Sequence, residues 1–523
     1  EHAGLDKLHG LVSIKMANNK LTALPRYFAN FRHLRSLNMS SNCFQVFPEF
    51  LGSLRSLVDL DISFNAIEEV TNLGSLTALE RLWMTNNLLS GPLDASFKNL
   101  VNLKQIDARF NAITNIDSLS GLPRLEQLLL GHNAVSKFRG SFPKLRTFVL
   151  DHCPVTQFDL DAPVPTLATL NVASAKLVQF RDSLFENIPN LTKLVLDKNH
   201  FVSISPHIGK LRRLEYFSMI KNPLSSLPAT IGCLSELKYL NLRECNLNKL
   251  PPEIWYCANL ETLNVSSNVL DAFPRPGAQP PQPPSELAST ASDHLGAPGS
   301  DDFDTFGELD VRRPSQASAG GASIGSSPSG GGYRTPSLAS SQGQGGRKVS
   351  TASRSTADVS GPPRKDSNYS QHMAITFAGS LKQLYLADNR LEDDVFRELS
   401  MIPELRVVNL SYNELSELPQ GLLKRWPNLT ELYLSGNELT SLPSDDLEEG
   451  SNLRILHINA NRFLVLPAEL CKVSKLAILD VGSNALKYNV SNWPYDWNWN
   501  WNRNLKYLNF SGNKRLEVKP NVA

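Results

Sequence analysis

The sequence predicts an α/β repeat solenoid, in which short strands stack into a parallel inner sheet and helical turns return the chain. Two observations support this fold. An asparagine recurs about every 23 residues, and each one ends the same frame of alternating leucines, Leu-x-x-Leu-x-Leu-x-x-Asn-x-Leu. Leu34, Leu37, Met39, Asn42 and Phe44 fill this frame once, and it recurs to the end of the chain.

Each part of the frame has a structural reason. Its leucines alternate with variable residues, so a short strand buries the leucines and turns the variable side chains outward. The asparagine amide can donate and accept, so successive asparagines are expected to form a hydrogen-bonded ladder. The second half-repeat often reads Leu-Pro-x-x-Ile-x-x-Leu, as at 227–234, which favours a helical turn with proline at its start. The pattern predicts a leucine-rich-repeat horseshoe.

The ladder positions give a count of about 18 repeats. Three positions lack asparagine: Cys153 and Cys245 offer only a weak thiol donor, and Ala175 cannot form a side-chain hydrogen bond. Since no repeat can bury its leucines alone, stability is expected to be a sum over neighbouring repeats. The positions are Asn19, Asn42, Asn65, Asn87, Asn111, Asn133, Cys153, Ala175, Asn199, Asn222, Cys245, Asn268, Asn389, Asn413, Asn437, Asn461, Asn484 and Asn513.

We expect two blocks of repeats separated by an insertion. Residues 1–274 hold about 12 repeats, and residues 376–523 hold about six and a tract rich in tryptophan and asparagine. Residues 275–375 lose the frame: 279–284 is rich in proline, and 315–341 consists mainly of serine, glycine and alanine. Such a composition buries too little apolar surface to fold, so a disordered insertion of about 100 residues is predicted.

Composition narrows the function classes. The net charge of +1 argues against a nucleic-acid partner. No run is long and apolar enough to span a membrane, and no signal peptide is recognisable. The six cysteines do not cluster, so they are interpreted as small buried residues in a reducing, cytoplasmic compartment. The first frame starts almost at once without a polar cap, so the chain is interpreted as a segment of a longer protein.

No motif predicts catalysis in this chain. Nucleotide-binding loops, zinc-protease helices, nucleophile elbows and paired Cys-x-x-Cys motifs are not found, so no catalytic residue, metal site or cofactor is assigned. His132 and His152 occupy equivalent positions in consecutive repeats and could approach each other, but two histidines without a third ligand are interpreted as surface residues. Asp59 and Asp61 share one face of a strand and are interpreted as solvated charges.

The insertion holds three serines that follow basic residues: Ser315, Ser350 and Ser367. A basophilic kinase with an acidic pocket would read such basic residues. These serines are therefore phosphorylation candidates, although serine-rich segments produce such matches by chance.

The outward strand positions predict a partner-binding surface. Aromatic residues recur there, and basic residues gather around the ninth to eleventh repeats. Exposed aromatics mixed with Arg and Lys are the composition of protein-binding hot spots. Acidic neighbours such as Asp197 and Glu244 leave an ordinary solvent-facing surface as the alternative. The predicted binding residues are Lys193, Lys198, Tyr216, Lys221, Tyr239 and Arg243, with the stretch 83–109 as second choice.

The repeat series resembles the leucine-rich-repeat region of fungal adenylate cyclases. The specific part is the tract 488–519, YNVSNWPYDWNWNWNRNLKYLNFSGNKRLEVK, which is similar to the junction between the repeats and a phosphatase-like domain in those enzymes. The resemblance covers nearly all of this chain but excludes the cyclase domain. The parent protein would therefore be an adenylate cyclase that converts ATP to cAMP and diphosphate with magnesium, bound outside this chain.

The resemblance also implies a partner. The repeats of this family bind a Ras-type small GTPase in its GTP form, which implies a cytoplasmic protein with peripheral membrane association through Ras. The leading hypothesis is a regulatory region that binds activated Ras and couples it to cAMP synthesis by a downstream domain. The alternatives are a free-standing repeat scaffold that links a small GTPase to a phosphatase or kinase, and an immune-type receptor sensor.

Overall fold

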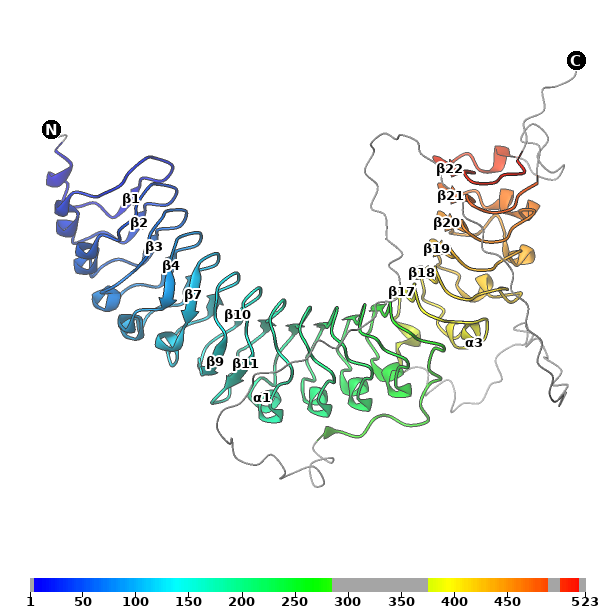
Figure 1. Ribbon diagram of the computed structural model, residues 1–523, viewed down its shortest axis with the longest axis horizontal. Helices are drawn as coiled ribbons and strands as arrows, with labels where there is room; N and C mark the ends of the chain where they lie inside the picture. Colours follow the sequence, from blue (N-terminus) through cyan, green and yellow to red (C-terminus); the bar gives the residue numbers. More distant parts are fainter. Residues whose placement is uncertain (1–3, 285–374, 488–498, 517–523) are drawn as a thin grey trace, which may run out of the picture. The chain divides into compact units, whose positions relative to one another are not determined.

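The structure, a computed structural model, describes residues 4–284, 375–487 and 499–516 (Figure 1). These residues belong to one compact unit. Within them, 18 strands pair side by side, all parallel and in chain order, into one sheet that we call the long sheet. The predicted repeat fold and the number of repeats are confirmed.

The strands of the long sheet are three residues each, and in most of them the middle residue is buried between two partly exposed ones. They are β1 (Ser13–Lys15), β2 (Ser36–Asn38), β3 (Asp59–Asp61), β4 (Arg81–Trp83), β6 (Gln105–Asp107), β8 (Gln127–Leu129), β10 (Thr147–Val149), β12 (Thr169–Asn171), β13 (Lys193–Val195), β14 (Tyr216–Ser218), β15 (Tyr239–Asn241), β16 (Thr262–Asn264), β17 (Gln383–Tyr385), β18 (Val407–Asn409), β19 (Glu431–Tyr433), β20 (Ile455–His457), β21 (Ile478–Asp480) and β22 (Tyr507–Asn509).

Most repeats return through a 3-10 helix. The leucines and isoleucines of the return segments recur at intervals of three, which matches the three residues per turn of this helix. Two α-helices, α1 (Asp182–Asn187) and α3 (Val395–Leu399), replace it in their repeats. The 3-10 helices are η1 (Leu5–Lys7), η2 (Arg26–Asn30), η3 (Glu49–Ser53), η4 (Leu73–Ser75), η5 (Ala95–Asn99), η6 (Asp117–Leu119), η7 (Pro206–Lys210), η8 (Ala229–Cys233), η9 (Pro252–Tyr256), η11 (Phe377–Gly379), η12 (Leu423–Arg425), η13 (Ser444–Asp446), η14 (Ala468–Lys472) and η16 (Trp499–Trp501).

Two short parallel pairs lie beside the long sheet. Strand β5 (Ser90–Pro92) pairs with β7 (Ala112–Asn115), and β9 (Lys137–Gly140) pairs with β11 (Gln157–Leu160). They add backbone hydrogen bonds between consecutive repeats after the ladder turns. A continuous core of leucine, isoleucine, valine and phenylalanine lies between the long sheet and the return segments.

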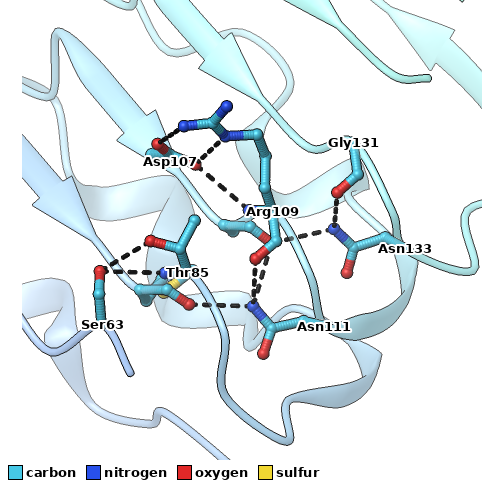
Figure 2. A network of polar contacts seen from close by, with 9 residues as sticks. Ser63, Thr85, Asp107, Arg109, Asn111, Gly131 and Asn133 are labelled. Carbon is cyan, nitrogen blue, oxygen red and sulfur yellow. Dashed lines mark hydrogen bonds and ion pairs between the residues drawn. The ribbon is translucent and has the colours of Figure 1, made fainter. Parts of the chain in front are cut away.

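The asparagine ladder joins most repeats to the one before. The Asn111 amide donates to the carbonyl oxygen of Met84 at 2.9 Å and to that of Ala108 at 3.0 Å, while its oxygen accepts from the Leu89 amide at 3.1 Å. Figure 2 shows Asn111 and Asn133 in the turns that follow two neighbouring strands. One side chain therefore satisfies buried backbone groups of two repeats.

The ladder weakens at two of the three positions that lack asparagine; at the third, Cys245 Sγ still lies 3.0 Å from the Met219 carbonyl oxygen. Cys153 Sγ lies 3.4 Å from both the Asn133 amide nitrogen and the Leu130 carbonyl oxygen, so it replaces the asparagine with longer contacts. At the level of Ala175, the Val155 amide donates to the backbone oxygen of Cys153 at 2.8 Å instead of to a side chain. The region around 153–175 is thus held with fewer side-chain bonds between repeats.

The long sheet continues across the insertion. Strand β16 pairs directly with β17, although Thr262 and Gln383 lie far apart in the sequence. The ladder is unbroken there too, since the Asn389 amide donates to the Val265 oxygen at 3.0 Å and its oxygen accepts from the Leu270 amide at 3.0 Å. Residues 285–374 of the predicted insertion lie outside the described residues.

The start of the predicted insertion is packed, which differs from the expected boundary at 275. The Tyr256 hydroxyl donates to the Gly277 carbonyl at 2.8 Å, and a Cβ on Gly232 would lie 3.0 Å from Pro281. A Cβ on Gly209 would likewise lie 2.9 Å from Pro284. Residues 275–284 therefore run back over η9, η8 and η7, and the glycine at 209 leaves room for Pro284.

The core and ladder can be tested at one repeat. Leu434→Ala removes a fully buried side chain and should lower the free energy of unfolding by about 2–5 kcal/mol. Asn437→Ala leaves the Leu415 amide without its acceptor at 3.1 Å and should cost about 1–3 kcal/mol. Urea unfolding would measure both changes. The exposed Asn248→Ala is the matched control, and an equal loss there would contradict the ladder assignment.

Continuity of the sheet predicts that residues 285–374 can be replaced. A Gly/Ser linker of about 20 residues, with a mean span of roughly 25 Å, can join residues 284 and 375. The strand pairs and ladder bonds between β16 and β17 stay intact, so the melting temperature should change by less than about 2 °C. Scanning calorimetry of the parent and the replacement would measure this. A drop of several degrees would mean that 285–374 contributes to stability.

Candidate functional site

The first residues of three neighbouring strands form an aromatic and basic surface. Lys193, Tyr216 and Tyr239 begin β13, β14 and β15 and stand in register across the long sheet. The two tyrosine rings stack with centroids 4.3 Å apart and planes 7° apart, and Lys193 Nζ lies 4.7 Å from the Tyr216 centroid. Stacking and the cation–π contact give this surface a fixed shape.

The tyrosines are partly buried, with their hydroxyl groups in polar contact. The Asn241 amide donates to the Tyr239 hydroxyl oxygen at 2.9 Å. Burial raises the pKa of Tyr216 to about 12, and the neighbouring Tyr239 and Asp197 add to the shift. Tyr216 is thus a neutral hydrogen-bonding group with a broad apolar face.

The predicted cations Lys198 and Lys221 occupy a second column. Both are exposed and both have a left-handed backbone, with φ of 53° and 59°. Glu244 takes the equivalent place in the next repeat with φ of 58° and lies 3.9 Å from both Lys221 Nζ and Arg243 Nη1. Exposed pairs at this distance contribute little, so the cations stay available to a partner.

All six predicted binding residues therefore lie on three adjacent repeats. The surface is mixed in charge, as the sequence indicated. Asp197 accepts from the Ile220 amide at 2.8 Å and from the Ser218 hydroxyl at 2.5 Å, so part of its charge is used inside the sheet. Further along the sheet, the Tyr433 hydroxyl donates to Glu431 at 2.9 Å.

The interpretation of Asp59 and Asp61 as solvated charges is wrong. Asp59 Oδ1 lies 2.5 Å from Arg81 Nε of the next strand, and Asp61 accepts from the Ser63 amide at 3.0 Å. The Asp61 bond recurs in many repeats: the side-chain oxygen of the third strand residue accepts from the backbone amide two residues later. Sequence reasoning missed these bonds because these positions look variable. The signal was an excess of asparagine and aspartate, found at Asn38, Asp61, Asp107, Asn171, Asn241, Asn264, Asn409, Asp480 and Asn509.

The approach of His132 and His152 is confirmed, because their rings stack with centroids 4.1 Å apart. The interpretation of the cysteines as buried residues is confirmed for Cys153, Cys245, Cys257 and Cys471, but Cys233 is only partly buried and Cys43 is exposed. Burial raises the pKa values of the Cys153, Cys245 and Cys257 thiols to about 11, 12 and 12. Within the described ranges, no helix is long and apolar enough to cross a bilayer. The phosphorylation candidates Ser315, Ser350 and Ser367 lie outside the described residues.

Fold and repeat pattern define this chain as a leucine-rich-repeat protein. Family models described as leucine rich repeat match residues 77–135, 189–247, 403–449 and 33–54. Solved structures agree on the fold. A leucine-rich-repeat protein of Leptospira interrogans superposes with a TM-score of 0.57 at 19% identity, over 99% of this chain and 95% of that one. A TDR receptor gives 0.57 at 19% identity, over 96% and 76%. Such a fold is suited to protein–protein interaction.

Curated relatives narrow the assignment. The chain is 51% identical to an adenylate cyclase of Podospora anserina over 99% of its own length, and 49% identical to an adenylate cyclase of Neurospora crassa over 86%. An adenylate cyclase of Mycosarcoma maydis is 46% identical over 75%. The predicted resemblance to the repeat region of fungal adenylate cyclases is confirmed. The chain spans 25%, 20% and 14% of these relatives' lengths.

Tyr216 gives a prediction for alkaline pH. Between the ordinary pKa of 10.0 and the folded value of about 12, the unfolded chain loses the proton and the folded protein keeps it. Stability should therefore fall as pH rises from about 10 to about 12, and this group adds no pH dependence below 10. Tyr216→Phe should flatten that fall in urea unfolding. The exposed Tyr507→Phe is the control, and an unchanged slope in Tyr216→Phe would contradict the assignment.

Proposed function

We propose that this chain is the regulatory leucine-rich-repeat region of an adenylate cyclase. In this proposal it binds a Ras-type GTPase in its GTP form and couples binding to cAMP synthesis from ATP by a catalytic domain elsewhere in the parent protein. The similarity to adenylate cyclases over 99% of the chain supports the assignment to a cyclase. A binding role is supported by the outward-facing residues of the long sheet and by a sequence in which no catalytic motif was found.

The observation that carries the docking site is the register of Lys193, Tyr216 and Tyr239 on β13, β14 and β15. Two stacked rings supply a rigid apolar anchor with few rotatable bonds. Lysines and an arginine border the anchor on the same three repeats. The Ras surface that faces its effectors is rich in acidic residues, so a basic border would speed association and orient the partner.

Charge reversal at Lys198 and Lys221 tests the site. The two residues sit in a left-handed backbone that already accepts glutamate at Glu244, so folding should be unaffected. Lys198→Glu with Lys221→Glu should weaken binding of GTP-loaded Ras about tenfold or more, mainly through slower association. The parent should bind more weakly as salt rises, because exposed charges are screened. Surface plasmon resonance with GTP- and GDP-loaded Ras would measure both effects.

The control pair is Lys98→Glu with Lys144→Glu, which changes the net charge equally on exposed residues outside the strands. An equal loss in the control would mean that net charge, and not this surface, steers the partner. Unchanged affinity in the double reversal would move the site to the stretch 83–109. Equal binding of the GTP and GDP forms would contradict the regulatory proposal itself.

A further inference from the structure

We propose that His132, Asp151 and His152 form a binding site for one divalent transition-metal ion of the zinc class. The ion would join two consecutive repeats at the edge of the weakened part of the ladder. The three side chains each offer one ligand atom, and these atoms all lie within 4.8 Å of one another. The sequence paired the two histidines but counted no third ligand; the structure adds Asp151.

The backbone holds the two histidines opposite each other. His132 and His152 occupy the left-handed position before the ladder residue in consecutive repeats, with φ of 58° and 53°. The His132 amide donates to the Asp151 carbonyl at 2.8 Å, which fixes the spacing of the two turns. Phe110 stacks on the outer side of His132 with centroids 4.3 Å apart, so one ring is supported from behind.

The carboxylate of Asp151 lies between these repeats and is turned toward the imidazoles. Its Oδ2 is 2.8 Å from His152 Nδ1 and 3.9 Å from His132 Nε2. A Cβ on Gly131 would collide with Asp151 Oδ1, so a glycine at this position makes room for the carboxylate. Asp151 is partly buried, with 20% of its side chain exposed, while the two imidazole side chains are 40% and 49% exposed.

The cation nearby does not occupy this carboxylate. The pKa of Arg109 is raised mainly by its hydrogen bond to Asp107, and the charge of Asp151 contributes, but the Arg109 guanidinium donates to Asp107 instead of Asp151. Its Nε lies 2.9 Å from Asp107 Oδ1 and its Nη2 lies 2.8 Å from Oδ2 (Figure 2). In the described part of the chain, the ionisable partners within 4 Å of the Asp151 carboxylate are the two histidines, and His152 Nδ1 forms a hydrogen bond with Oδ2 at 2.8 Å. No arginine or lysine therefore competes for this carboxylate in the described part of the chain, and an ion shared with the histidines would replace its hydrogen bond to His152.

Donor chemistry selects the ion. Two imidazoles and a carboxylate suit zinc, cobalt, nickel or copper, whereas magnesium and calcium prefer oxygen ligands. With bonds of roughly 2.0–2.1 Å, the ligand atoms of a tetrahedral zinc lie about 3.3 Å apart, between the two distances found here. Face-to-face rings cannot both point at one ion, so one ring must turn. His132 is stacked between Phe110 and His152, so the ring that must turn is His152, whose side chain is 49% exposed.

The test is zinc titration of the untagged full chain by calorimetry, with magnesium as comparison ion. We expect one equivalent of zinc, no magnesium binding at equal concentration, and a rise in melting temperature with zinc alone. His132→Asn and His152→Asn should each abolish this equivalent. Asparagine suits the left-handed backbone, as Asn18 and Asn86 show with φ of 60° and 51°. The exposed His33→Asn is the matched control and should bind as the parent does.

A second variant tests the geometry without removing a ligand. Gly131→Ala should displace the Asp151 carboxylate and weaken zinc binding about tenfold or more, with circular dichroism confirming the fold. Zinc binding that survives in either histidine variant would overturn the proposal. The proposal would also be overturned if the parent bound two equivalents of zinc and each histidine variant lost one of them, because that pattern means two independent surface histidines. Equal magnesium and zinc binding would also overturn it.

Discussion

Most repeats are tied to their neighbour by one side chain that hydrogen-bonds to the backbone of both. The strands are only three residues long, so the turns after them carry backbone groups that the sheet cannot pair. The ladder asparagine pairs them: Asn437 donates to the Leu410 carbonyl at 3.0 Å and to the Leu434 carbonyl at 3.1 Å, and its oxygen accepts from the Leu415 amide at 3.1 Å. An unpaired buried group would cost about 1–3 kcal/mol, so the amide fixes the turn and the spacing of the repeats.

Because the repeats are evenly spaced, residues at the same position of successive repeats line up in columns on the surface. Residues one repeat apart face each other, as Lys193 and Tyr216 do on the sheet, or His132 and His152 at the turn. The residue before the ladder position must adopt a left-handed backbone, which places its side chain at the same point of every turn. Binding residues can therefore change along a column without disturbing the core beneath.

The sequence was sufficient for the fold because its determinants are local. Alternating leucines indicate a buried strand, and the asparagine indicates the turn that follows it. The strands and the ladder could therefore be predicted even across the interruption between Asn268 and Asn389. Contacts between side chains of different repeats were harder. The pair Asp59–Arg81 and the ligand Asp151 depend on which outward residues meet, and only superposing successive frames would reveal them. The packing of 275–284 follows no sequence period, because it depends on single contacts such as Tyr256 with Gly277 and Gly209 with Pro284.

That packing bears on the proposed docking surface. The tract 275–284 runs behind η9, η8 and η7, which follow β15, β14 and β13 in the same three repeats. The strands with Lys193, Tyr216 and Tyr239 are thus joined in front by sheet pairing and behind by a proline-rich segment with few accessible conformations. In a stack where each repeat contacts only its neighbours, such a segment links three repeats at once. Holding these strands in place before binding lowers the entropy lost when a partner docks.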